Sequence, residues 1–147
     1  MIREFLAKLV PLGLIVIGIK RDSKFRNIVC DDLKDAESVV ARYMLDDKAD
    51  IYFGLGSLVS RKHTCLDGKT RVRVQDNIKG LKSFWVDIDV EADHEGHDKY
   101  SSVEAAEGAV LRFIADHHMP QPMIVFSGGG LHVYWPLAKA VSKDSWQ

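Results

Sequence analysis

The chain has 147 residues and a formal net charge of −1, with 46% hydrophobic and 28% charged residues. This composition is ordinary for a soluble globular protein, excludes a low-complexity chain, and is not basic enough to predict nucleic-acid binding by itself. Two cysteines, Cys30 and Cys65, form no Cys-x-x-Cys pair. They therefore predict neither a disulfide framework nor a zinc site, and favour a reducing, cytoplasmic location. The length predicts a single domain over residues 1–147 that buries about 70% of its extended surface.

An apolar run from Leu9 to Ile19 comes first along the chain and faintly resembles a signal peptide. Pro11 and Gly13 interrupt this run, and no small-residue cleavage site follows it. The run is also too short to cross a bilayer, which takes ~20 residues. We therefore expect a buried strand over 12–19 and no association with a membrane.

Alternating strand and helix patterns follow and predict an α/β (α+β) fold, with a mixed sheet flanked by helices. The first helix is expected to be capped by Asp31 or Asp32, and the second to begin with a capping box from Ser101 to Glu104. The apolar residues expected to form the core stripe of the second helix are Val103, Ala106, Val110, Phe113 and Ile114. The predicted order is strand 26–30, helix 33–46, strand 50–56, a basic loop over 61–82, strand 83–90, helix 102–117, and strands 123–127 and 131–137. These elements form an N-terminal part (1–60), the basic loop and a motif region (83–137).

The predicted loop over 61–82 carries seven lysines and arginines against two aspartates, whereas 87–107 carries eight acids against one lysine. Lysine and arginine side chains attract phosphates, and carboxylates bind metal ions. This asymmetry of charge is therefore typical of an enzyme acting on triphosphates or nucleic acid. Arg71 and Arg73 alternate with two valines and are expected to point from one strand face. A solvated polar loop is the alternative interpretation.

The segment Phe84–Val90 places two carboxylates on one face of a predicted strand. Because side chains alternate along a strand, Asp87 and Asp89 share a face opposite to an apolar one. Paired carboxylates at this spacing can bind one hard divalent cation or bracket two. The alternative is a solvated polar face on an edge strand. The apolar face and Trp85 favour a central strand. A charged side chain there loses favourable solvation unless it is paired or binds a metal ion.

The segment Ser127–Trp135 places a glycine turn and a histidine at the entry to the last predicted strand. Gly128, Gly129 and Gly130 let backbone N–H groups approach a phosphate with no Cβ in the way. His132 and Tyr134 are expected on one face of that strand, opposite Leu131, Val133 and Trp135. The alternative is a hairpin with a glycine bend and core aromatic residues.

Together these two segments resemble motifs I and II of the archaeo-eukaryotic primase superfamily, the primase-polymerases of phages, plasmids and integrated elements. Motif I of that family is a hydrophobic strand with Asp-x-Asp, which matches Asp87 and Asp89. Motif II often looks like Ser-Gly-x-Gly-x-His-x-Tyr-Trp, which matches Ser127 to Trp135. The resemblance extends over about residues 51–137.

The resemblance implies a metal-dependent nucleotidyltransferase, a DNA primase or primase-polymerase acting in replication. Asp87 and Asp89 would hold Mg²⁺ or Mn²⁺, and His132 would contact the triphosphate. Nucleotide ligands would also come from Ser127, Gly128, Gly129, Gly130, Arg71 and Arg73. The implied partners are nucleoside triphosphates, a single-stranded DNA template and a helicase domain or protein. Two alternatives are a non-catalytic replication-initiation or nucleic-acid-binding domain, and a glycosyltransferase that uses Asp-x-Asp to hold a sugar nucleotide.

The third motif of the family, a later hydrophobic strand with a carboxylate, is not evident. Asp144 is the only acid after His132, and its polar surroundings predict the start of a helix. We therefore expect a primase-polymerase-like core that is truncated at its C-terminus and polymerises poorly. A cluster of acids and histidines over 93–98 is interpreted as exposed turn residues rather than a metal site.

Overall fold

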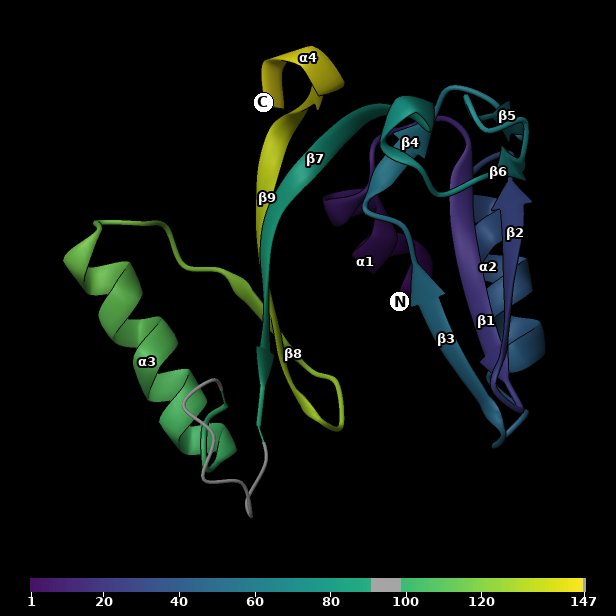
Figure 1. Ribbon diagram of the computed structural model, residues 1–147. Helices are drawn as coiled ribbons and strands as arrows, with labels where there is room; N and C mark the ends of the chain where they lie inside the picture. Colours follow the sequence, from purple (N-terminus) through teal and green to yellow (C-terminus); the bar gives the residue numbers. More distant parts are fainter. Residues whose placement is uncertain (91–98, 147) are drawn as a thin grey trace. The chain divides into compact units, whose positions relative to one another are not determined.

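The computed structural model describes residues 1–90 and 99–146 and shows a mixed α+β fold (Figure 1). The chain is divided into two compact units. The first unit comprises 1–83 and 137–147, and the second comprises 84–136. Both long strands, β7 (Ile78–Asp89) and β9 (Gly130–Ser142), contribute residues to both units.

The first unit is built around β1 (Ile15–Arg21), which lies between β2 (Lys24–Cys30) and β3 (Ala49–Phe53) in an antiparallel sheet. β1 is apolar because it is the central strand, and its first five residues are buried. The predicted strand over 12–19 therefore begins three residues too early. Leu12, expected in the core, is 85% exposed, because Gly13 with φ +125° turns the chain before the strand.

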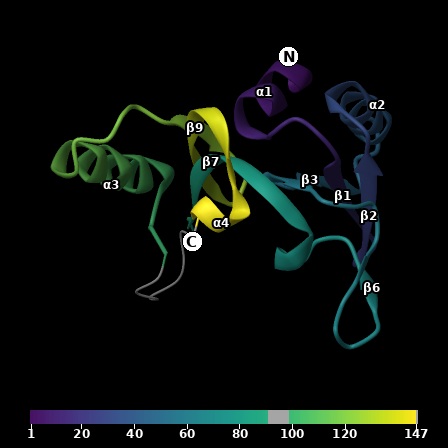
Figure 2. The ribbon, with the colours of Figure 1, turned by 90° about the horizontal axis from the view of Figure 1, so that it is seen from above.

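Two helices lie on one side of this sheet (Figure 2). α1 (Ile2–Leu9) was not predicted, and it packs an edge of Phe5 against Phe53. α2 (Leu33–Tyr43) confirms the predicted helix, although it ends three residues early. Its N-cap is Asp32, whose carboxylate accepts hydrogen bonds from the backbone N–H groups of Lys34 and Asp35, both at 2.8 Å.

The expected loop over 61–82 contains regular structure. Beyond β4 (Gly56–Leu58), it forms a hairpin of β5 (His63–Thr64) and β6 (Thr70–Arg71), a 3₁₀ turn η1 (Gln75–Asn77) and the start of β7. Asn77 anchors this segment from a buried position. Its amide nitrogen donates to the carbonyls of Ser60 and Val72, both at 2.9 Å, and its oxygen accepts from the Ser60 backbone N–H at 3.0 Å.

The second unit contains the C-terminal part of β7, the N-terminal part of β9, β8 (Met123–Phe126) and α3 (Val103–Asp116). β8 and β9 form an antiparallel hairpin, and β9 lies between β8 and β7. Leu131, Val133 and Trp135 on β9 form a core with α3, as the alternation predicted. The buried residues of α3 are Ala106, Val110 and Ile114.

Two details of α3 differ from the prediction. Its N-cap is Ser102 rather than Ser101, and the Ser102 hydroxyl accepts a hydrogen bond from the backbone N–H of Ala105 at 3.1 Å. Phe113, expected in the core stripe, is 45% exposed because it lies at the margin of the helix face.

A short helix, α4 (Lys143–Trp146), ends the described chain and confirms the expected helix start near Ser142. Both cysteines are free, as expected. Among the helices of the described residues, none is long and apolar enough to span a membrane.

Candidate functional site

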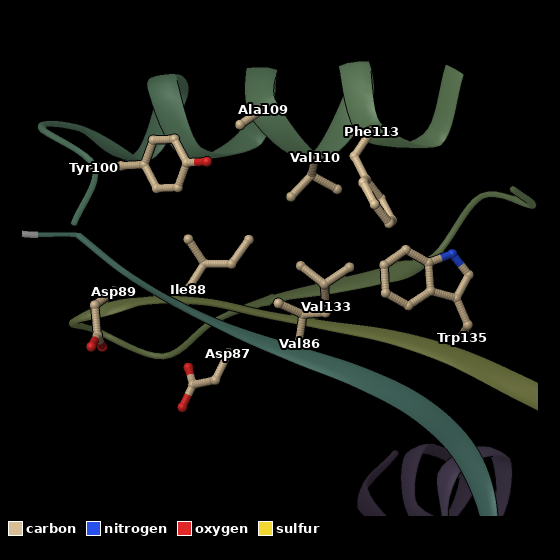
Figure 3. A pocket seen from close by; sticks show the side chains of 10 residues that line it. All are labelled: Val86, Asp87, Ile88, Asp89, Tyr100, Ala109, Val110, Phe113, Val133 and Trp135. Carbon is tan, nitrogen blue, oxygen red and sulfur yellow. The ribbon is translucent and has the colours of Figure 1, made fainter. Parts of the chain in front are cut away.

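Asp87 and Asp89 project from one face of the C-terminal part of β7. Ile88, between them, points toward α3, whereas both carboxylates point away from that helix (Figure 3). The Asp87 side chain is 69% exposed. The predicted alternation is therefore correct, and the carboxylates are open to solvent and to a ligand.

The position of β7 in its sheet is only partly what the sequence predicted. In strand order β7 is internal, between β4 and β9. Within the described residues, however, β4 pairs with β7 only from Ile78 to Leu81. Around Asp87 the strand has β9 on one side, which explains why Val86 and Asp87 are exposed.

His132 lies on β9, on the same sheet face as the carboxylates. Its Nε2 atom is 3.4 Å from Oδ1 of Asp87, and its Nδ1 atom is 3.3 Å from the hydroxyl of Tyr134. Which ring nitrogen donates depends on the tautomer: because a carboxylate only accepts, the tautomer with its proton on Nε2 presents an N–H to Asp87 and leaves Nδ1 to accept from the Tyr134 O–H. The expectation that His132 and Asp87 meet on one face is confirmed.

Tyr134 is buried, and its phenol is kept protonated. Burial raises the pKa of Tyr134, and the negative charge of Asp87 raises it further. A protonated phenol can donate to Nδ1 of His132, and such a bond favours the tautomer with the proton on Nε2. The sequence placed Tyr134 beside His132, but only the side-chain geometry shows that its hydroxyl lies within hydrogen-bond distance of the ring.

The glycine turn joins β8 to β9 beside the end of β7. The backbone N–H of Ser127 donates to the carbonyl of Gly130 at 3.0 Å, and the carbonyl of Gly129 accepts from Val90 at 2.9 Å. Gly128 has φ +91°, which L side chains rarely adopt. These bonds hold the turn next to the Asp89 end of β7.

Arg71 and Arg73, predicted to contact phosphates, both belong to the first unit. The guanidinium of Arg71 donates to both carboxylate oxygens of Asp67, at 3.0 and 2.6 Å, and this bond lowers the pKa of Asp67. The guanidinium of Arg73 lies 5.5 Å from the centre of the Phe25 ring. β6 ends at Arg71, so the expected common strand face does not form. Their role as phosphate ligands stays a prediction.

The donor set fits a hard divalent cation that also binds a nucleotide. Within residues 1–90 and 99–146, no group of three or more His, Cys, Asp or Glu side chains is placed to hold a metal ion. Mg²⁺ in nucleotide sites commonly takes one or two carboxylates and completes its shell with phosphate oxygens and water. Asp87 and Asp89 supply that number. The acidic cluster over 93–98 lies outside the described residues, and Asp144 lies on α4 in the first unit.

A pocket of about 370 Å³ lies between β7, β9 and α3 (Figure 3), and Asp87 and Asp89 are among the residues that line it. Its walls are mainly apolar and include Ile88, Val110, Val133 and Trp135. Sequence reasoning missed this pocket, because a gap between a helix and a sheet leaves no periodic signal.

Comparisons of the chain with known protein families, curated proteins and solved structures found no match.

Proposed function

We propose that the chain is a metal-dependent nucleotidyltransferase of the DNA primase or primase-polymerase type. The observation that carries the proposal is the approach of His132 Nε2 to Asp87 Oδ1 at 3.4 Å, with the glycine turn held beside the same strand. A metal-bound triphosphate would use all three features: the carboxylate pair for the metal ion, and the imidazole and the glycine turn for its phosphates.

In the proposed reaction a 3′-hydroxyl attacks the α-phosphate of an incoming nucleotide and pyrophosphate leaves. Asp87 and Asp89 would hold Mg²⁺ or Mn²⁺, which neutralises charge on the phosphates. His132 would donate its Nε2 proton to a phosphate oxygen, and Tyr134 would keep the ring in that tautomer. Ser127 and the backbone N–H groups of the glycine turn would bind the remaining phosphate oxygens.

A glycosyltransferase would use the carboxylate pair equally well, because a sugar nucleotide also carries a diphosphate. It gives no specific role to His132 or to the turn at Ser127–Gly130. We therefore favour triphosphate chemistry.

The test is calorimetric titration of the chain with a dNTP in the presence of Mn²⁺. We expect Asp87→Asn with Asp89→Asn to weaken binding at least tenfold, because the metal loses both charged ligands. Asp116→Asn, at the end of α3 in the same unit, is the matched control and should bind as the wild type does. Since Asp87 is exposed, the double variant should keep its thermal midpoint within a few degrees.

Primer synthesis on single-stranded DNA then tests the reaction itself, with the same three proteins. Unchanged nucleotide affinity in the double variant would refute the metal assignment. Metal-dependent binding of a sugar nucleotide in preference to a dNTP would favour the glycosyltransferase instead.

A further inference from the structure

A second surface, in the first unit, carries two exposed aromatic rings on one face of the β2–β1–β3 sheet. Phe25 is 47% exposed and Tyr52 is 41% exposed. The register places Tyr52 opposite Gly18 and Phe25 opposite Lys20, so all four residues share a face. The two ring centres are 5.6 Å apart, with an angle of 47° between the planes.

Gly18 explains why the rings lie across the strand. A Cβ atom at this position would be 2.4 Å from Cζ of Phe25 and 3.4 Å from Cβ of Tyr52. The missing side chain therefore leaves room for the end of the Phe25 ring over β1. One side of the ring covers the glycine, and much of the remainder is open to solvent.

Two positive groups, on Arg73 and Lys20, lie beside this pair of rings. The guanidinium of Arg73 lies 5.5 Å from the centre of Phe25, and Lys20 pairs directly with Phe25 in the register. Arg61 binds the edge of β2, where its guanidinium donates to the carbonyl of Val29 at 3.0 Å. Asp50, opposite Lys20, is the acid that the register places on this face. Arg61 also forms an ion pair with Asp31, so it is Arg73 that brings the basic segment to the aromatic face.

Exposed rings beside cations fit single-stranded nucleic acid better than other ligands. Unpaired bases stack on aromatic rings and on guanidinium planes, while lysine and arginine neutralise the phosphates. A duplex keeps its bases stacked inside and offers this surface only phosphates.

We propose that this face of the first unit, formed by Phe25, Tyr52, Arg73 and Lys20, binds single-stranded DNA by base stacking. The surface contains neither Asp87 nor Asp89, so its binding needs no metal ion, and it gives Arg73 a role other than the nucleotide contact that the resemblance implies. The choice of DNA over RNA rests on the proposed function. The competing explanation is structural, namely that Phe25 only covers Gly18.

The experiment measures fluorescence anisotropy of a labelled fifteen-nucleotide oligo-dT with the full chain in EDTA. Stacking contributes ~1–3 kcal/mol per base, so Tyr52→Leu and Phe25→Leu should each weaken binding about tenfold. Phe113→Leu is the matched control, because Phe113 is 45% exposed and lies on α3 in the second unit. We expect Phe113→Leu to bind as the wild type does. Arg73→Lys keeps the charge but not the guanidinium plane, and should weaken binding severalfold with little change in salt dependence.

An abasic strand of the same length separates stacking from attraction of charge. We expect it to bind at least tenfold more weakly than oligo-dT. Equal affinity for the abasic strand, or tighter binding of a duplex, would overturn the proposal. Wild-type affinity in Tyr52→Leu would do the same and leave the rings a structural role, even if Phe25→Leu fails to fold. Tighter binding of oligo-rU than of oligo-dT would overturn the choice of DNA.

The Asp87→Asn, Asp89→Asn variant keeps the two proposals distinct. Because the assay contains no metal, this variant should bind oligo-dT normally. A wild type that binds the dNTP but not oligo-dT would refute only the aromatic surface, and one that binds oligo-dT but not the dNTP would refute only the nucleotide site.

Discussion

The imidazole of His132 and the carboxylate of Asp87 meet across two neighbouring strands, with Nε2 3.4 Å from Oδ1. The pair is half-exposed, so this contact adds little to stability. Tyr134 holds the other ring nitrogen at 3.3 Å. These contacts lead to a prediction that separates ligand binding from ring orientation.

We expect His132→Ala to lower affinity for a metal-bound dNTP about tenfold, because one charge-directed hydrogen bond is lost. Tyr134→Phe keeps the packing but removes the donor to Nδ1, and should lower affinity only a few-fold. Nitrogen chemical shifts of the imidazole should show the Nε2–H tautomer in the wild type and a mixture in Tyr134→Phe. An unchanged tautomer population in that variant would show that Tyr134 does not position the ring.

The glycine turn offers a matched pair of substitutions. A Cβ on Gly130 would lie 2.0 Å from the carbonyl oxygen of Ile88, which is backbone and cannot give way. A Cβ on Gly129 would meet nothing within 4 Å. Gly130→Ala should therefore cost about 3 kcal/mol or more of unfolding free energy, and Gly129→Ala less than about 0.5 kcal/mol. Urea denaturation measures both, and equal midpoints would contradict the close approach of β9 to β7.

The sequence predicted the site better than its surroundings, for a physical reason. Alternation along a strand is local, so the faces of Asp87, Asp89 and His132 followed directly from their spacing. Their proximity followed once both strands were placed in one sheet. The site's functional role, by contrast, rests on a resemblance and on the proposed experiments.

Where prediction failed, non-local contacts decided the structure. α1 is too short to be stable by propensity alone, and it forms because Leu6 and Leu9 are buried against the rest of the first unit. The segment over 61–82 looked like a loop because its charges mask two short strands. The aromatic surface was also missed, since Phe25 and Tyr52 are 27 residues apart in the sequence and only the register of β1 brings them together.

Asn77 tests how firmly the basic segment is fixed. Its side-chain amide donates to two carbonyls, those of Ser60 and Val72, from a fully buried position. Asn77→Asp replaces this donor by an acceptor and should cost about 3 kcal/mol. Asn27→Asp is the matched control, because Asn27 is exposed on β2 and should change little. Equal urea midpoints for the two variants would show that the segment is not anchored by Asn77.

Cys30 provides a prediction about pH. Burial, and then the negative charge of Asp35, raise the pKa of the Cys30 thiol from 9.0 to about 11. The folded chain therefore holds this proton more tightly than the unfolded chain does. The resulting stabilisation is fully present below pH 9 and is lost as the pH rises toward 11. Over this range the thiol lowers the free energy of unfolding by no more than about 1.4 kcal/mol per pH unit.

Two measurements check this prediction. At pH 8.5 iodoacetamide should modify Cys65, which is partly exposed, much faster than Cys30, which is fully buried. At pH 8.5 the rise of the Cys30 pKa from 9.0 to about 11 alone lowers its thiolate fraction about 80-fold, and burial slows access further. In urea denaturation between pH 8.5 and 10.5, Cys30→Ala should lose stability less steeply than the wild type, because lysines and tyrosines titrate in both proteins and only the thiol differs. Cys65→Ser should follow the wild-type curve. Parallel curves for the wild type and Cys30→Ala, together with equal modification rates for the two thiols, would show that Cys30 is neither buried nor shifted.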